Sequence, residues 1–141
     1  MSRRDKKSEF LFVYGTLRKA LNHPLSHFLM GNATFEGMAT VYGKLYDVGR
    51  YPALTSSNNP DDAVVGEVYR LKDVSDVLSK LDDYEGCGPN DAEPTQYRRL
   101  PMQATMSNHE KVQTWVYVYN WTTEGLTLIP DGDYMAYVSQ K

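Results

Sequence analysis

The chain has 141 residues, of which 41% are hydrophobic and 23% charged, a composition that fits one globular domain with its own core. Its formal net charge is −3, with 15 basic and 18 acidic residues mixed along most of the chain, so no basic patch indicates a nucleic-acid partner. The single cysteine, Cys87, excludes an intrachain disulfide and fits a reducing cytoplasm, and no stretch reaches the roughly 20 apolar residues that cross a bilayer.

The first predicted elements are a tail, a strand and a helix. Residues 1–9 are basic, and we expect them to form a disordered tail rather than a signal peptide, because the apolar stretch that follows is short. Phe10–Tyr14 is a run of aromatic and apolar residues, which is typical of a strand buried on both faces. The chain then turns at Gly15, and apolar residues at helical spacing predict a helix between Thr16 and Met30.

The middle of the chain has the pattern of a bent sheet. Residues from Ala33 to Tyr46 favour a strand, in which Gly37 and Gly43 indicate bulges or sharp bends. Residues 55–62 are polar and contain a proline, so they predict an exposed loop. Val64 to Leu71 predicts another strand. Such kinked strands are common in small barrels.

A second helix is predicted after Asp73. The apolar residues that recur at helical spacing are Val74, Val77, Leu78, Leu81 and Tyr84. Asp73 suits the N-cap of this helix, and Gly86 suits a left-handed residue just past its end. At about 100° per residue, Glu85 lies only roughly 20° from Leu78 around the helix axis and shares the buried face, whereas Asp83 points to solvent and Asp82 lies on the flank.

Glu85 is the candidate general base of the sequence. Burial and the negative field at the carboxyl end of a helix both disfavour a carboxylate, so we expect a raised pKa, which suits proton transfer near neutral pH. The alternative is a frayed helix end, with Glu85 turned into water. Cys87 follows Glu85 closely, but we do not expect it to be a catalytic nucleophile. Such a cysteine pairs with a histidine, and the sequence shows no recognisable pairing of this kind.

The last third of the chain predicts a gate and a hairpin. Residues 87–94 form a loop next to Glu85 that is placed to act as a substrate gate. Strands from Tyr97 to Met106 and from Val112 to Trp121 are joined by the polar turn Ser107–Glu110. One face of the second strand carries Trp115, Tyr117 and Tyr119, a pattern that favours core packing over an aromatic row facing a cavity. Six or so strands and two helices predict an α+β domain, a small mixed, strongly bent β-barrel flanked by helices.

No metal site is expected. His23 and His27 would share a helix face, but the glutamate of a His-Glu-x-x-His pattern does not follow His23, and His109 lies in a predicted turn. We interpret all three as surface histidines.

Several segments carry a family resemblance. They are Phe12–Arg18, Tyr51–Leu54, Val65–Tyr69, Leu81–Gly86, Tyr97–Arg99, Trp115–Tyr119 and Pro130–Tyr134. In this order they resemble the landmarks of the γ-glutamylcyclotransferase-like family, which includes γ-glutamylamine cyclotransferases and AIG2-like proteins. The match spans residues 10–137, which we expect to form the single domain.

The resemblance implies an intramolecular reaction without metal or cofactor. The α-amine of a γ-glutamyl group attacks its own γ-carbonyl, which yields 5-oxoproline and a free amine or amino acid. Glu85 is then the acid/base, and Tyr97 lies near the pocket, with Tyr119 or Tyr117 as a second phenol. The glutamyl part is cradled by a strand-to-helix turn that matches Tyr14, Gly15, Thr16 and Leu17. Backbone N–H groups in a sharp turn at a helix amino end suit a carboxylate or an oxyanion.

Partners and alternatives follow from this hypothesis. We expect a cytoplasmic monomer or weak homodimer that acts on a small γ-glutamyl metabolite and binds neither nucleic acid nor membrane. One alternative is a non-catalytic module that holds a metabolite or a peptide end in the same pocket. Another is acyl transfer or hydrolysis, in which a second amine or water replaces the internal nucleophile.

Overall fold

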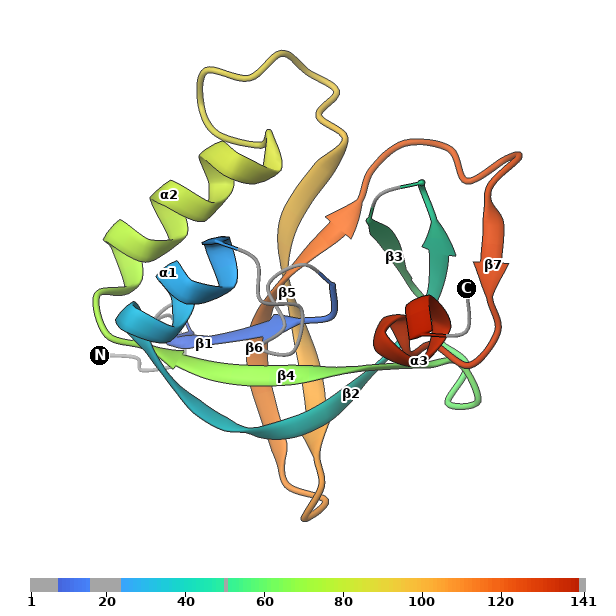
Figure 1. Cartoon of the computed structure of the whole chain (residues 1–141), viewed down its shortest axis with the longest axis horizontal. Coiled ribbons are helices and arrows are strands. Elements are labelled where there is room, and N and C mark those ends of the chain that lie inside the picture. Colours follow the sequence, from blue (N-terminus) through green and yellow to red (C-terminus); the bar gives the residue numbers. More distant parts are fainter. Residues whose placement is uncertain (1–7, 16–23, 50, 140–141) are drawn as a thin grey trace.

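The computed structural model in Figure 1 describes residues 8–15, 24–49 and 51–139. Its elements in chain order are β1 (Phe10–Val13), α1 (Pro24–Asn32), β2 (Ala33–Asp47), β3 (Pro52–Ser56), β4 (Ala63–Leu71), α2 (Val74–Glu85), β5 (Tyr97–Met106), β6 (Lys111–Tyr119), β7 (Thr127–Ile129) and α3 (Tyr134–Ser139).

The strands form a closed, mixed barrel, which confirms the predicted fold. The order β2-β4-β1-β6-β5 returns to β2 through pairing of Thr40 with Thr105, so the sheet closes on itself. The β1–β6 pair is parallel, whereas β1–β4, β2–β4 and β5–β6 are antiparallel. Closure of a small sheet demands strong bending of its strands.

The long strand β2 is bent at two glycines. A register shift between Phe35 and Gly37 marks a β-bulge, and Gly37 has a φ of 143°, which confirms the bulge expected there. At Gly43 the strand leaves β4 and continues beside β3 and β7. A Cβ at Gly43 would lie 2.7 Å from the Thr55 carbonyl oxygen, so only glycine fits this approach of two strands.

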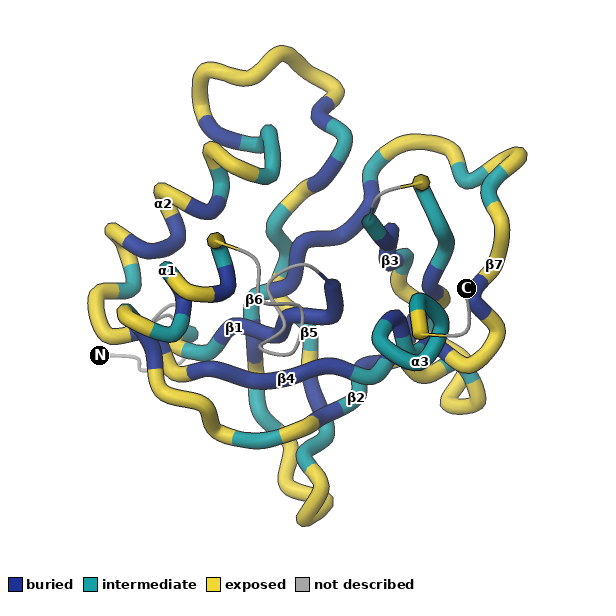
Figure 2. Tube along the Cα trace, viewed as in Figure 1, coloured by how far each residue is buried: buried dark blue, intermediate teal, exposed yellow. Residues whose placement is uncertain are grey.

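The core lies on both faces of the barrel strands. Leu11 and Val13 of β1 pack beneath α1 and α2, while Phe12 between them packs into a second cluster with Val41 and Val64. Alternate residues of one strand therefore serve the two clusters. In Figure 2 the buried residues follow β1, β4 and β6 through the centre of the molecule.

Helix α2 has the limits that its sequence predicts. The side chain of Asp73 accepts a hydrogen bond from the backbone N–H of Asp76 at 3.2 Å, and Gly86 closes the helix in the left-handed conformation with φ 75°. Leu78 and Leu81 are buried against the sheet, and Asp83 is exposed as expected. The helix expected from Thr16 to Met30 is described from Pro24 to Asn32, because residues 16–23 lie outside the described residues.

Three boundaries differ from the sequence prediction. Ser8 and Glu9, predicted as part of the tail, precede β1 but are hydrogen-bonded to the sheet. The Ser8 carbonyl accepts from Trp115 Nε1 at 3.0 Å, and the Glu9 carbonyl accepts from the Leu71 N–H at 2.8 Å. Residues 1–7 lie outside the described residues. Thr55 and Ser56, predicted in a loop, extend β3. Strand β6 ends at Tyr119, so Trp121, predicted as its last residue, follows it.

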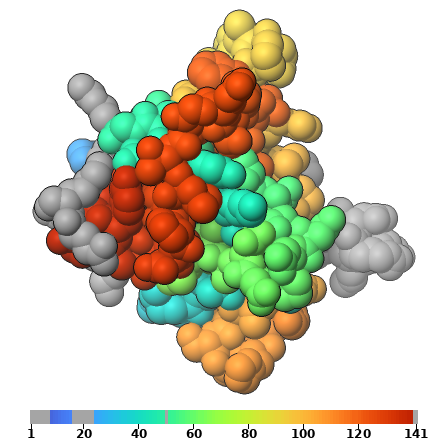
Figure 3. Space-filling view, turned by 90° about the vertical axis from the view of Figure 1, so that its right-hand side faces the viewer, coloured from blue at the N-terminus to red at the C-terminus, as the bar shows by residue number. Residues whose placement is uncertain are grey.

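The predicted hairpin is confirmed, and the two final elements were not predicted. Strands β5 and β6 pair from Tyr97 with Tyr119 to Thr105 with Lys111 around the expected polar turn. The sequence pattern did not predict the short elements β7 and α3. In Figure 3, α3 and the chain before it cover one side of the molecule, while the β5–β6 hairpin and the loop after α2 project at opposite ends. None of the described helices has the length and apolar composition needed to cross a bilayer.

Candidate functional site

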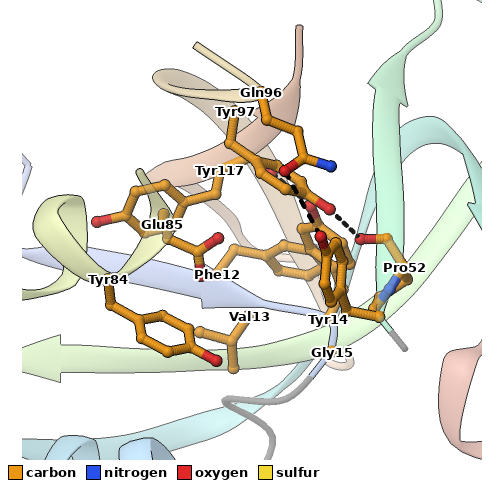
Figure 4. A pocket seen from close by; sticks show the side chains of 11 residues that line it. Phe12, Val13, Tyr14, Gly15, Pro52, Tyr84, Glu85, Gln96, Tyr97 and Tyr117 are labelled. Atoms are coloured by element: carbon orange, nitrogen blue, oxygen red, sulfur yellow. Dashed lines mark hydrogen bonds between the residues drawn. The ribbon is translucent and has the colours of Figure 1, made fainter. Parts of the chain in front are cut away.

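A pocket of about 230 Å³ lies between the end of β1, the last turn of α2 and the start of β5. It is lined by Phe12, Val13, Tyr14, Gly15, Tyr51, Pro52, Tyr84, Glu85, Gln96, Tyr97 and Tyr117 (Figure 4). Among these described residues, Glu85 is the only acidic one and none is basic. The others are apolar, aromatic or neutral polar. The pocket therefore presents one acid/base group in mostly apolar surroundings.

The helix directs Glu85 into this pocket. Leu78 and Leu81 anchor the inward face of α2 in the core, and Glu85 lies on that face at the last helical position. Gly86 then turns the chain away, and its N–H contacts the carbonyls of Asp82 and Asp83. In Figure 4 the Glu85 carboxyl points into the pocket, toward the side on which Tyr14 and Tyr97 lie. The frayed-end alternative is thereby excluded.

Burial shifts the pKa of the Glu85 carboxyl toward neutral pH. Burial raises the pKa of Glu85 from its ordinary value of 4.5 to about 7, and the negative charge of Asp82 adds to the effect. No hydrogen bond or ion pair joins this carboxyl to another residue within the described part of the chain. The predicted direction and its first cause, burial, agree with the structure, whereas the contribution of Asp82 was not foreseen.

The tyrosine hydroxyls of the pocket are bound to backbone carbonyls. Tyr14 donates to the Tyr117 carbonyl. Tyr97 donates to the Pro52 carbonyl at 2.9 Å (Figure 4). Burial raises the pKa of both phenols well above the usual range, so both remain neutral. These bonds join β1 to β6 and β5 to β3, and they fix the shape of the pocket wall.

Asp82, predicted on the flank of α2, is half-buried and has a partner that the sequence did not predict. Arg99 donates to both of its carboxylate oxygens, at 2.7 Å from Nε and 3.0 Å from Nη2. The Tyr117 hydroxyl donates to the same group at 2.7 Å. Arg98 is exposed, so the two arginines point to opposite faces as expected.

The structure brings most of the predicted site residues together. Tyr14, Gly15 and Tyr97 line the same pocket as Glu85. Thr16 and Leu17, the other half of the predicted cradle, lie outside the described residues.

Of the two candidate tyrosines on β6, Tyr117 lines the pocket and Tyr119 is not among the described lining residues. Tyr119 pairs in register with Tyr97 on the neighbouring strand, and its ring packs edge-on against the Tyr97 ring with centroids 5.5 Å apart. It is absent from the described lining residues, which include Tyr117. Both residues have the same parity along β6, so the sequence pattern alone does not distinguish them.

Sequence reasoning missed the wall formed by Tyr51, Pro52 and Gln96. Tyr51 and Pro52 belong to a segment with family resemblance, which was the available signal, whereas Gln96 has none beyond its place before Tyr97. Gly15 packs directly on this wall. A Cβ at Gly15 would lie 2.7 Å from Pro52 Cγ, so the absence of a side chain lets the turn approach Pro52.

Neither Cys87 nor the two described histidines, His27 and His109, is placed as a nucleophile or a metal ligand. Burial and the nearby carboxylates raise the pKa of the half-buried Cys87 thiol to about 12, which agrees with its exclusion as a nucleophile. His27 is exposed on α1, His109 lies in the β5–β6 turn, and His23 is outside the described residues. In residues 8–15, 24–49 and 51–139, no group of three or more potential ligand side chains is placed to hold a metal ion.

Comparisons with known proteins show the family of the chain. The family model described as gamma-glutamyl cyclotransferase, AIG2-like, matches residues 11–136. A gamma-glutamylcyclotransferase family protein of Citrobacter rodentium is 33% identical over 126 residues, which cover 89% of this chain and 94% of that protein. The gamma-L-glutamyl-butirosin B gamma-glutamyl cyclotransferase of Niallia circulans is 35% identical over 113 residues, which cover 78% of this chain and 66% of that protein.

A solved structure shows the same fold. The crystal structure of an AIG2-like protein from Mus musculus superimposes with a TM-score of 0.67 at 25% identity, covering 87% of this chain and 86% of that chain. The resemblance that the sequence segments indicated is confirmed, and the chain belongs to the AIG2-like gamma-glutamyl cyclotransferase family.

Proposed function

We propose that the protein converts a small γ-glutamyl amine or γ-glutamyl peptide into 5-oxoproline and a free amine or amino acid, with Glu85 as the acid/base. The observation that supports this most directly is an otherwise unpaired carboxyl in a neutral pocket, with its pKa raised to about 7. Such a group both takes and returns a proton near neutral pH. The γ-glutamyl chemistry is suggested by the relatives, one of which is named for γ-L-glutamyl-butirosin B.

The size of the pocket favours the γ-glutamyl head as the bound part. Its volume of about 230 Å³ is below the ~300–1,000 Å³ of pockets that enclose drug-sized ligands. The leaving amine would then extend past Tyr84, whose side chain is half exposed at the pocket. Holding the bent head with its amine against its own carbonyl contributes through orientation, worth about 7–11 kcal/mol in favourable intramolecular systems.

The reaction requires the transfer of two protons. The α-ammonium gives one proton to the Glu85 carboxylate, and its nitrogen then attacks the γ-carbonyl carbon to close a five-membered ring. The ring nitrogen loses a second proton, and the bond from the γ-carbon to the leaving nitrogen breaks as that nitrogen is protonated. Both protons end on the released amine, so one carboxyl can serve as base and then as acid. General acid–base catalysis of this kind is typically worth 10²–10⁴-fold.

The test follows 5-oxoproline by mass spectrometry with a panel of γ-glutamyl amines and γ-glutamyl amino acids. Glu85→Gln keeps the shape of the side chain, so we expect it to retain ligand binding in calorimetry and to lose turnover by at least about 10²-fold. Asp83→Asn, an exposed carboxylate on the same helix, is the matched control and should retain wild-type turnover. Equal turnover by Glu85→Gln and wild type would refute the mechanism.

The products separate this proposal from its alternatives. Release of glutamate instead of 5-oxoproline would indicate hydrolysis, and a new γ-glutamyl amide would indicate transfer. Binding without any product across the panel would favour a non-catalytic module that uses the same pocket.

A further inference from the structure

A half-buried ion pair lies beside the proposed acid/base. The side chains of Asp82 and Arg99 are only 16% and 23% exposed, and two parallel hydrogen bonds of 2.7 and 3.0 Å join them. Bidentate contacts between arginine and a carboxylate are among the stronger and more directional hydrogen bonds in proteins. The Arg99 guanidinium also lies over the Trp115 ring, 4.5 Å from its centroid. The pair thus ties the last turn of α2 to β5 and β6.

The same pair connects Glu85 to a pocket wall. Asp82 and Glu85 are three positions apart on α2, which places them on adjoining turns of one side of the helix. The Tyr117 hydroxyl donates to Asp82 at 2.7 Å, and the Tyr117 ring lines the pocket. Tyr14, across the pocket, donates to the Tyr117 carbonyl. Movement of the pair would therefore displace both the carboxyl and the aromatic wall that faces it.

We propose that Asp82 and Arg99 are positioning residues for Glu85: their ion pair fixes the last turn of α2 and the Tyr117 ring at the pocket, and the balance of its two charges governs proton exchange by the Glu85 carboxyl. This inference rests on the proposed function, because it assigns the pair to the acid/base of that reaction.

The charges near Glu85 come from this pair. The described titratable groups around it are Asp82 and Tyr84 on α2, Cys87 just after α2, Tyr14 at the end of β1, Tyr51 just before β3, Tyr97 and Arg99 on β5, and Tyr117 on β6. Phenols and thiols are neutral near pH 7 by their ordinary chemistry. Among these groups, the negative Asp82 and the positive Arg99 are therefore the ones whose removal changes the local charge. Asp82 disfavours the Glu85 carboxylate, and Arg99, paired with Asp82, offsets that negative charge.

Two single variants test the charge balance. Asp82→Asn keeps an acceptor oxygen but removes the negative charge, so the Glu85 carboxyl should ionise at a lower pH. Arg99→Gln leaves Asp82 uncompensated, so Glu85 should ionise at a higher pH. We expect shifts of about 1 pH unit in opposite directions, from the usual effect of a charge within a few ångströms. The measurement is the titration of the Glu85 carboxyl carbon by NMR, assigned by comparison with Glu85→Gln.

Further variants separate charge from geometry and from folding. The double variant Asp82→Asn/Arg99→Gln is neutral and should titrate near the wild-type midpoint. Arg99→Lys keeps the charge but not the bidentate contact, so its midpoint should stay near that of wild type while kcat falls. If Arg99→Gln fails to fold, Asp82→Asn and Arg99→Lys still carry the test. Circular dichroism checks the fold of each variant.

The outcomes distinguish this inference from the proposed function. The positioning role would be supported if the Glu85 titration midpoint moved in opposite directions in the two single variants. The acid limb of the pH profile of kcat/KM should move with it in each variant. Midpoints that stay at the wild-type value, or that move in the same direction, would overturn it. The NMR titration needs no substrate, so a loss of the proposed function would be seen separately, as wild type that produces no 5-oxoproline.

Discussion

Replacing Glu85 by glutamine should change the stability of the fold in a pH-dependent way, before any substrate is added. Burial, with a contribution from Asp82, raises the pKa of this carboxyl from its ordinary value of 4.5 to about 7 in the folded protein. The unfolded chain exposes the group to water, so its pKa there returns to the ordinary value. The folded state therefore keeps a proton that the unfolded state has already released.

The sign and size of the effect follow from this difference. The stability that the protonated carboxyl contributes is fully present below about pH 4.5 and is lost as the pH rises through about 7. Each pH unit between the two values corresponds to about 1.4 kcal/mol, so the loss reaches about 3 kcal/mol. Glutamine has nearly the same shape and no proton to lose. Glu85→Gln should therefore match wild type near pH 4 and exceed its free energy of unfolding by about 3 kcal/mol near pH 8.

Urea unfolding measures this directly. The chain contains two tryptophans, and fluorescence follows unfolding of the core near Trp115. The free energy of unfolding is compared between wild type and Glu85→Gln from about pH 4 to about pH 8, at equal m values. Asp83→Asn, from an exposed position on the same helix, should show no comparable pH trend. A difference between wild type and Glu85→Gln that stays constant over this range would refute the reasoning.

Other positions give independent predictions. Gly15→Ala would place a methyl group 2.7 Å from Pro52 Cγ, so we expect kcat/KM to fall with the fold retained. Gly31→Ala is the control, because nothing lies within 4 Å of the added methyl group, and it should leave kcat/KM unchanged. An equal loss of kcat/KM in both variants would contradict this reasoning. Cys87, with its pKa raised to about 12, should resist iodoacetamide at neutral pH until urea unfolds the chain, and fast modification of the folded protein would argue against burial. Asp73→Ala removes the cap of α2 and should lower the free energy of unfolding by about 1 kcal/mol in urea titrations, where an unchanged midpoint would exclude a capping role.

Local signals were sufficient for the part of the site that depends on one helix. Asp73 and Gly86 mark the two ends of α2 through interactions within a single turn, and the spacing of Leu78 and Leu81 defines its buried face. Glu85 lies at a fixed angle from that face, so its inward direction and its raised pKa could be predicted. The β5–β6 hairpin was predictable for the same reason, because its turn residues and its alternation are local.

Short elements at the end of the chain were not predictable in this way. Strand β7 has three residues and α3 has six, which are too few for a period to appear. Their positions depend on pairing with β2 and on packing of Tyr134 into the core. The attachment of Ser8 and Glu9 to the sheet likewise depends on Trp115 and Leu71, which are distant in the sequence.

The sequence by itself determined that the chain forms a bent barrel with an inward carboxyl at the end of one helix, since propensity, periodicity and capping act over a few residues. Only the tertiary structure decided which side chains surround that carboxyl. Alternation along β6 placed Tyr117 and Tyr119 on one face, and barrel closure then selected Tyr117 for the pocket. The contact of Asp82 with Arg99 joins a helix to a strand 17 positions away, and a contact of this kind depends on strand register and helix docking rather than on any local pattern.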